Sequence, residues 1–147
     1  MTEKSTLRSK VRAWFTPARI RLLLALVPVT AVGLMSKMVH IPHMAWIHNS
    51  LGGLLYVVFF ILLLLLIFPS WKPLYAALTV FLFTSALEFA QLIHHPFLEA
   101  VRATRPGRAL IGSTFNPADF TWYLAGAILG FLLVRLLLPP PASVSGR

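Results

Sequence analysis

Four long apolar runs constrain the fold of this 147-residue chain more than any other feature. They cover residues 20–38, 51–68, 74–93 and 118–138. A helix needs about 20 predominantly apolar residues to cross a hydrocarbon core of about 30 Å, and each run approaches that length. The sequence therefore predicts an all-α integral membrane protein with four transmembrane helices.

The composition supports this class and limits the chemistry. The chain is 58% hydrophobic and 12% charged, with a mean hydropathy of +0.80, which is typical of a membrane protein. It has no cysteine, so neither disulfides nor thiol chemistry are available. We expect a basic, amphipathic cytoplasmic segment at 1–19, a four-helix transmembrane domain at 20–138 and a disordered cytoplasmic tail at 139–147.

The net charge of +9 does not indicate nucleic-acid binding, because six of the thirteen basic residues fall in the first 21 positions. Such a cluster is typical of a segment beside an anionic inner leaflet. The segment also places four apolar residues on one helical face, which predicts a short N-terminal interfacial amphipathic helix. These residues are Leu7, Val11, Trp14 and Phe15. Thr16 and Pro17 then suit the cap and first turn of the next helix.

The basic residues also predict the orientation. With both termini in the cytoplasm, nine basic residues lie inside and four outside, which favours an N-in/C-in, multi-pass protein of the bacterial cytoplasmic (inner) membrane. Three of the four outer cations are Arg102, Arg105 and Arg108, which lie together in the link at 96–116. In that link we expect a short helix at 97–103 and a break at Pro106-Gly107.

This orientation gathers polar residues at the outer side. Glu88 follows Leu74 by about 14 residues, or roughly 21 Å of helix, which places it in the outer third of the hydrocarbon core. A charge near hydrocarbon tends to have a partner or a function. Glu88 is either protonated, paired with Arg102 or Arg105 to lock the bundle, or part of a ligand site. The candidate cluster for a ligand or for structure is Glu88, Gln91, Arg102, Arg105, Asp119 and Tyr123.

Asp119 has a structural explanation beside the functional one. Asn116 fits an N-cap, Pro117 the first helical position and Asp119 the third, where an acid stabilises a helix start. Gly126 and Gly130 form a GxxxG pattern for close helix packing, inside the bundle rather than between two copies. Gly52 and Gly53 near the second run are expected to serve likewise.

Neither a metal nor a catalytic set is expected. Adjacent residues such as His94 and His95 point to different faces of a helix, and Pro42 interrupts His40 and His43. A tetrapyrrole or metal bound through these four histidines is the alternative to a protein without cofactors. The sequence holds no Ser/His/Asp set and no phosphate loop. Whether the chain is an enzyme stays open, with a non-enzymatic protein favoured and no catalytic residue assigned.

One pattern resembles a known family. It comprises Glu88-x-x-Gln91, Arg102-x-Thr104, Gly107, Leu110-x-Gly112, Phe115, Asp119, Tyr123 and Gly126. It resembles small bacterial membrane proteins grouped as domain of unknown function 2809, which are similar to the VanZ-like group. A weaker match covers 48–56, where Gly53 stands in place of an expected acid. The resemblance covers about 22–137 and implies a four-helix membrane protein without a settled activity. The VanZ-like group is associated with resistance to a lipoglycopeptide antibiotic, which implies a connection to envelope lipids or polymers.

Three functions are compatible with these residues. The first is a non-enzymatic membrane protein whose outward-facing cationic site binds an anionic lipid or envelope component. The second is an accessory subunit of a larger membrane complex, for example a photosynthetic or respiratory one. The third is a small transporter or membrane enzyme that uses Glu88. The expected partners are therefore membrane lipids and possible membrane subunits, but not nucleic acid.

Overall fold

The computed structural model describes residues 16–38 and 45–138, apart from Ser113. This part of the chain is helical and contains no strand. The helices are α2 (Pro17–Met38), α3 (Ala45–Ile67), α4 (Pro73–Ala90), α5 (Pro96–Ala103), α6 (Arg105–Ile111) and α7 (Asp119–Leu137). The predicted interfacial helix and the predicted tail fall on 1–15 and 139–147, outside the described residues.

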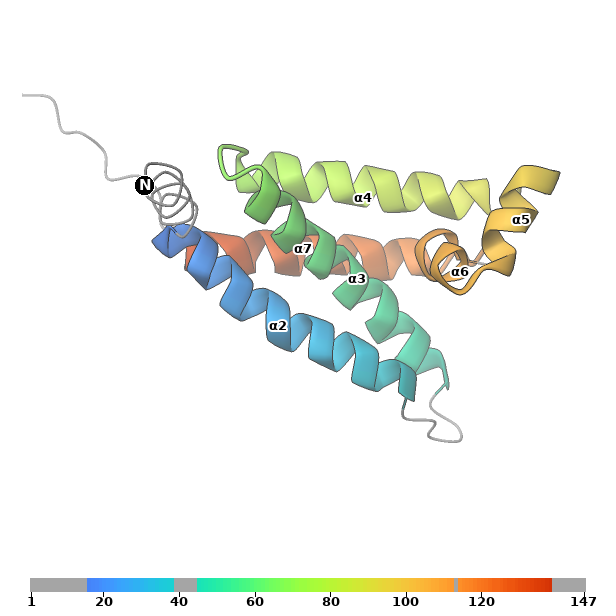
Figure 1. Ribbon diagram of the computed structural model, residues 1–147, viewed down its shortest axis with the longest axis horizontal. Coiled ribbons are helices and arrows are strands. Elements are labelled where there is room, and N and C mark those ends of the chain that lie inside the picture. The colour runs from blue at the N-terminus through green and yellow to red at the C-terminus, as the bar shows by residue number, and fades with distance from the viewer. Residues whose placement is uncertain (1–15, 39–44, 113, 139–147) are drawn as a thin grey trace, which may run out of the picture.

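Four of these helices, α2, α3, α4 and α7, are long and apolar enough to cross a membrane, as predicted. They form a bundle in which α3 packs against the other three (Figure 1). It runs antiparallel to α2 and α4 and parallel to α7. The start of α2 and the end of α7 meet at one end of the bundle, where Arg21 Nη1 donates a hydrogen bond to the carbonyl of Leu137 at 3.1 Å. The chain therefore folds as a multi-pass membrane protein in which the start of α2 and the end of α7 lie at the same end of the bundle.

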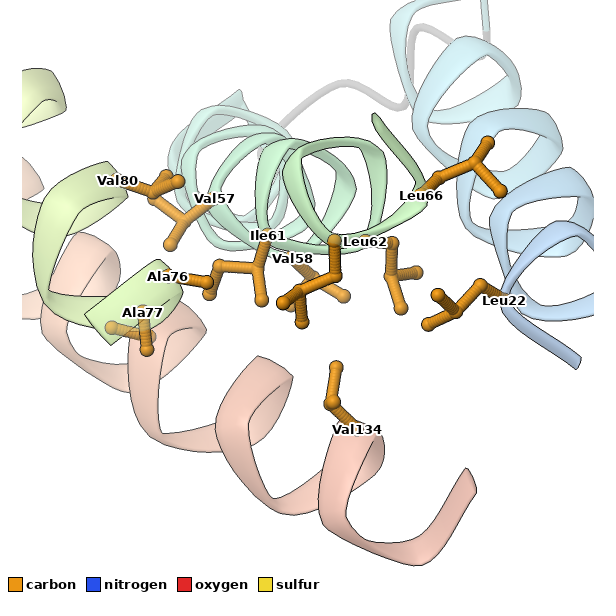
Figure 2. Packing of buried hydrophobic residues seen from close by; sticks show 12 residues of the cluster. Leu22, Val57, Val58, Ile61, Leu62, Leu66, Ala76, Ala77, Val80 and Val134 are labelled. Carbon is orange, nitrogen blue, oxygen red and sulfur yellow. The ribbon is translucent and has the colours of Figure 1, made fainter. Parts of the chain in front are cut away.

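The core of the bundle is supplied mainly by one face of α3. Val57, Ile61 and Leu62 on this face are fully buried, and Figure 2 shows them between side chains of α2, α4 and α7. The outward faces of the helices are apolar too, with Leu24 and Leu82 largely exposed. An apolar outer surface is what a helix bundle presents to lipid chains, so its packing rests on close fit rather than on exclusion of water.

Small residues bring α3 and α7 together. A Cβ atom at Gly126 would lie 2.6 Å from the carbonyl oxygen of Leu54, and one at Gly130 would lie 2.7 Å from Ile61 Cδ1. Gly53 of α3 faces Tyr123 in the same way, with 3.1 Å between the built Cβ and Tyr123 Cε1, and its neighbour Gly52 is partly buried. The GxxxG pattern thus lies within the bundle, where the absent side chains let two helix backbones approach.

Two short helices, α5 and α6, cover one end of the bundle beside the end of α4 and the start of α7 (Figure 1). We call residues 96–111 the end cap. The predicted short helix is present as α5, but the predicted break at Pro106-Gly107 is wrong, because α6 runs through both residues. The break is at Thr104 instead. Proline is tolerated in the first turn of a helix, where its missing N–H has no intrahelical partner.

Candidate functional site

Among the described residues, Glu88 is the most deeply buried polar one, at 1% exposure. Three donors meet its carboxyl group. The backbone N–H of Asn116 donates to Oε1 at 2.7 Å, while Gln91 Nε2 and the Tyr123 hydroxyl donate to Oε2 at 2.9 and 3.0 Å. We call these four residues the Glu88 cluster. A carboxylate accepts hydrogen bonds at both oxygens, so three donors match it as an acceptor.

The cluster joins α4 to the start of α7. Glu88 is in the last turn of α4 and Gln91 is its C-cap, so the two side chains lie on one helical face at i and i+3. Tyr123 comes from the second turn of α7, and Asn116 lies just before that helix. A charged or polar contact between two helices in lipid favours one relative position of those helices, because any other leaves a buried group unpaired.

The prediction that Asn116 is the N-cap of the fourth span is wrong, because the N-cap of α7 is Ala118 and its side chain makes no capping hydrogen bond. Asn116 instead holds the turn that leads into the helix. Asn116 Oδ1 accepts from the N–H of Ala118 at 3.2 Å, and Asn116 Nδ2 donates to Asp119 Oδ1 at 2.8 Å. The regular α7 begins at Asp119, two residues later than the predicted first position at Pro117. In a capping box the acid at the third position would accept the N–H of the cap residue. Here the N–H of Asn116, the predicted cap residue, goes to Glu88.

Gly112 is needed for the approach of Gln91. Its φ of +78° lies in the left-handed region, which glycine adopts without steric cost. A Cβ at this position would lie 2.5 Å from Gln91 Nε2. The backbone that links α6 to α7 therefore passes against the Gln91 amide, which explains why glycine suits the Leu110-x-Gly112 pattern.

Arg102 does not pair with Glu88, which was one of the predicted arrangements. It is 6% exposed, and its guanidinium donates to the carbonyls of Ala90 at 2.7 Å and Ile93 at 3.2 Å. It also forms an ion pair with Glu99 at 2.7 Å. The last carbonyls of a helix have no intrahelical donor, and a cation there complements the helix dipole. Arg102 thus binds the C-terminal end of α4 and holds α5 against it.

Thr104 and Gly107 form the sharp corner between α5 and α6. Thr104 Oγ1 accepts from the N–H of Gly107 at 3.0 Å and so caps α6. A Cβ at Gly107 would collide with the carbonyl oxygen of Val101, so no larger residue fits this corner. The spacing Arg102-x-Thr104 with Gly107 therefore encodes the shape of the end cap.

Arg105, the other arginine of the predicted cluster, and nearby Arg108 lie on the surface of the end cap. Arg105 and Arg108 are exposed. Arg108 Nε makes a long hydrogen bond, 3.4 Å, to the carbonyl of Arg102. Among the described residues, the ion pairs that the structure contains both involve Glu99, so neither arginine has a carboxylate partner there. The structure thus brings Glu88, Gln91 and Tyr123 together, connects Asp119 to them through Asn116, and separates the arginines from them.

Sequence reasoning missed three contacts that hold the end cap. Glu99 was not placed with Arg102, although i and i+3 spacing on α5 makes such a pair possible. The Tyr56 hydroxyl donates to the carbonyl of Leu110 at 3.1 Å, which links α3 to α6. His95 Nδ1 accepts from the N–H of Phe97 at 3.3 Å and caps α5. Only the His95-Pro96 order, a cap followed by proline, carried a signal for this last contact.

His94 and His95 take part in local contacts. His94 Nδ1 lies 3.5 Å from Glu99 Oε1 at an exposed site. Over residues 16–38 and 45–138, no group of three or more His, Cys, Asp or Glu side chains is placed to hold a metal ion. His40 and His43 lie outside the described residues.

Comparison with known proteins adds the family. No curated protein and no solved structure matched the chain. The family described as "Protein of unknown function (DUF2809)" matches residues 42–127, which is more than half of the chain. This stretch holds α3, α4, the end cap and the first half of α7, and with them the Glu88 cluster. The chain therefore belongs to the DUF2809 family.

Proposed function

We propose that this protein is a non-enzymatic membrane protein that binds an anionic lipid or envelope component through Arg105 and Arg108 on its end cap. The observation that carries the proposal is the contrast among the three arginines of the cap. Arg102 is buried and bonded to Glu99 and to backbone carbonyls. Arg105 and Arg108 are exposed and have no carboxylate partner among the described residues.

Two exposed guanidinium groups on one short helix suit an anionic headgroup. Arg105 and Arg108 are three residues apart on α6, a spacing that puts two side chains near one another on a helix surface. Guanidinium binds phosphate and carboxylate oxygens through paired N–H donors. The nearest acid of the cap, Glu99, already accepts from Arg102. The local positive charge is therefore available to a ligand.

The orientation supports an outer-leaflet ligand. We propose that both termini face the cytoplasm of a bacterium, because the basic residues are concentrated near the N-terminus. The end cap lies at the opposite end of the bundle from the start of α2 (Figure 1), so it would face the cell exterior. Three arginines at that side run against the usual charge distribution, and an anionic ligand supplies a reason for two of them.

The Glu88 cluster supports this proposal as its scaffold. A proton acceptor for transport or catalysis needs access to its substrate, whereas Glu88 is 1% exposed and has three donors from within the protein. We propose that the cluster fixes the end of α4 against the start of α7. The end cap between these two helices is then held in one position.

Native mass spectrometry of the purified protein from mixed vesicles tests the proposal. The protein is reconstituted with equal amounts of phosphatidylglycerol and phosphatidylcholine, and the bound lipids are counted. We expect the wild-type protein to retain phosphatidylglycerol in excess. The double variant Arg105→Gln/Arg108→Gln is expected to lose most of this excess, because it lacks the two guanidinium groups.

The matched control removes the same charge at the other end of the bundle. Lys72, beside the start of α4, and Arg135, near the end of α7, are both exposed, and Lys72→Gln/Arg135→Gln should keep the lipid preference. Equal losses in the two double variants would mean that total charge governs binding, and the proposal would fail. The same spectra test an accessory-subunit role, since that role predicts a co-purified protein.

A further inference from the structure

In the stretch from Glu88 to Arg102, three polar side chains are buried while most of the large apolar side chains are exposed. Glu88, Gln91 and Arg102 are buried, at 1%, 8% and 6% exposure. Between them, four large apolar side chains face outward. These are Phe89, Leu92, Ile93 and Phe97, each more than half exposed. A water-exposed helix has the opposite pattern, with its apolar face turned to the core.

This reversed pattern continues beyond the end of α4. Within α4 it is expected, because the helix is apolar enough to cross a membrane. The regular helix ends at Ala90, yet Leu92, Ile93 and Phe97 extend the exposed apolar surface into α5. Phe97, at 69% exposure, is among the most exposed aromatic side chains of the described chain. The exposed apolar surface of α4 therefore continues past Ala90, the last residue of the helix.

The length of α4 also indicates that the hydrocarbon core extends past the end of this helix. Its 18 residues rise about 27 Å at 1.5 Å per residue, which is short of the about 30 Å hydrocarbon core. The apolar segment that follows α4 is long enough to supply the missing thickness. That segment leaves regular helix, and backbone groups exposed to hydrocarbon need partners inside the protein. Arg102 provides donors to the carbonyls of Ala90 and Ile93 at this place.

We infer that the apolar face of α5, with Leu92, Ile93 and Phe97, is immersed in the acyl chains of the leaflet that surrounds the end cap. Arg102 then donates its hydrogen bonds to the carbonyls at the end of α4 within the membrane rather than at its surface. Exposed ionisable residues of the cap and of the segment before it fit the adjacent headgroup layer. They are His94, Glu99, Arg105 and Arg108. Amphipathic helices at membrane interfaces divide their residues in this way.

The inference does not depend on a particular headgroup, so it can hold where the proposed lipid preference fails. Its energetic basis is the burial of apolar area. Moving a large apolar side chain from water to hydrocarbon is favourable in proportion to the apolar area removed from water, and three such side chains favour immersion over solvation. The expected neighbour is lipid rather than a partner protein, because this exposed apolar surface continues the one along the outward side of the membrane-spanning helix α4.

Site-directed spin labelling tests the immersion, and the cysteine-free sequence makes single labels possible. Labels are attached through Leu92→Cys and Phe97→Cys in the full chain reconstituted into phosphatidylcholine vesicles. Collisions with oxygen report hydrocarbon, and collisions with a water-soluble nickel chelate report water. Leu82→Cys, on the outward face of α4, serves as the hydrocarbon reference. Ser70→Cys, in the turn between α3 and α4, serves as the aqueous reference.

We expect labels at 92 and 97 to have oxygen-to-nickel collision ratios near that at 82 and several-fold above that at 70. A label at His94→Cys, an exposed polar position just before the cap, should have a ratio well below those at 92 and 97. Ratios at 92 and 97 equal to that at 70 would overturn the inference. Poor access of both reagents at these positions would also overturn it, since the surface would then be covered by protein.

Discussion

The guanidinium of Arg102 donates a 2.7 Å hydrogen bond to the carbonyl of Ala90, so a side chain from α5 completes the C-terminal end of α4. The two residues are twelve positions apart, and the chain between them reverses its direction. A second bond to Ile93 and the ion pair with Glu99 fix the plane of the guanidinium. The end of a spanning helix and the fold of the end cap are therefore parts of one arrangement.

Arg102→Lys should loosen the end cap while leaving the bundle folded. Lysine keeps the charge, but its single ammonium group cannot reproduce the planar set of donors that serves two carbonyls and a carboxylate. We expect faster amide hydrogen exchange across 96–111 and unchanged exchange in the middle of α3, measured by mass spectrometry. Arg105→Lys, at an exposed position of the same cap, is the control. Equal exchange in both variants would contradict the role of Arg102.

Glu88→Gln should destabilise the folded protein even though it preserves size and shape. One carboxylate oxygen becomes an amide donor, which then faces either the N–H of Asn116 or the donors Gln91 and Tyr123. A buried donor without an acceptor costs about 1–3 kcal/mol. The free energy of unfolding in detergent by SDS titration measures the loss. Thr79→Ala, on the exposed side of α4, should leave stability nearly unchanged.

A double-mutant cycle with Tyr123→Phe separates this network from unrelated damage. The two substitutions share one hydrogen bond, at 3.0 Å. Their combined cost should therefore be smaller than the sum of the single costs. Strict additivity would show that the Tyr123 hydroxyl and the Glu88 carboxyl do not interact in the membrane.

Gly126→Ala should cost more stability than Gly130→Ala, although both glycines belong to one GxxxG pattern. The new methyl at 126 would meet the backbone carbonyl of Leu54, which cannot move without its helix. At 130 it would meet the end of the Ile61 side chain, which can adopt another rotamer. Overpacking of this kind costs about 1–3 kcal/mol. Unfolding by SDS gives both values, and the reverse order would contradict the described contact between α3 and α7.

Gly112→Ala and Gly33→Ala should change stability in opposite directions. Gly112 has a φ of +78°, and its new Cβ would displace the Gln91 amide. With ψ at 179°, this backbone conformation is adopted almost only by glycine and costs another residue about 1–3 kcal/mol. Gly33 lies in α2 with nothing within 4 Å of the built Cβ, where alanine should add about 0.5–1 kcal/mol. Thermal unfolding in detergent compares them, and a neutral Gly112→Ala would contradict the fit of Gln91 against this turn.

Much of the bundle follows from the sequence, because membrane thickness and hydropathy determine where helices cross. The four spans, the start of α2 after Thr16 and the short helix α5 were predicted, and the structure contains them. The partner of Arg102 could not be predicted in the same way. Backbone carbonyls occur at every residue, so no pattern of side chains identifies the two that this arginine binds.

The start of α6 shows a second limit of sequence reasoning. Pro106-Gly107 was interpreted as a break, since both residues end helices more often than they continue them. The outcome depended on Thr104, whose side chain caps α6, and on the close approach of the Val101 carbonyl to Gly107. Such a corner depends on where two helices are placed in space. Local propensity does not contain that information.

The most direct test of the account is the stabilisation of the protein by an anionic lipid. A ligand that binds the folded state alone raises the melting temperature with its concentration. We predict that added phosphatidylglycerol raises the melting temperature of the wild type but not of Arg105→Gln/Arg108→Gln. Glu88→Gln should start lower and still gain the wild-type increment. In this account the end cap binds lipid and the Glu88 cluster has a structural role. A full lipid-induced increase in melting temperature in the double arginine variant would contradict it. Loss of that increase in Glu88→Gln would contradict it too.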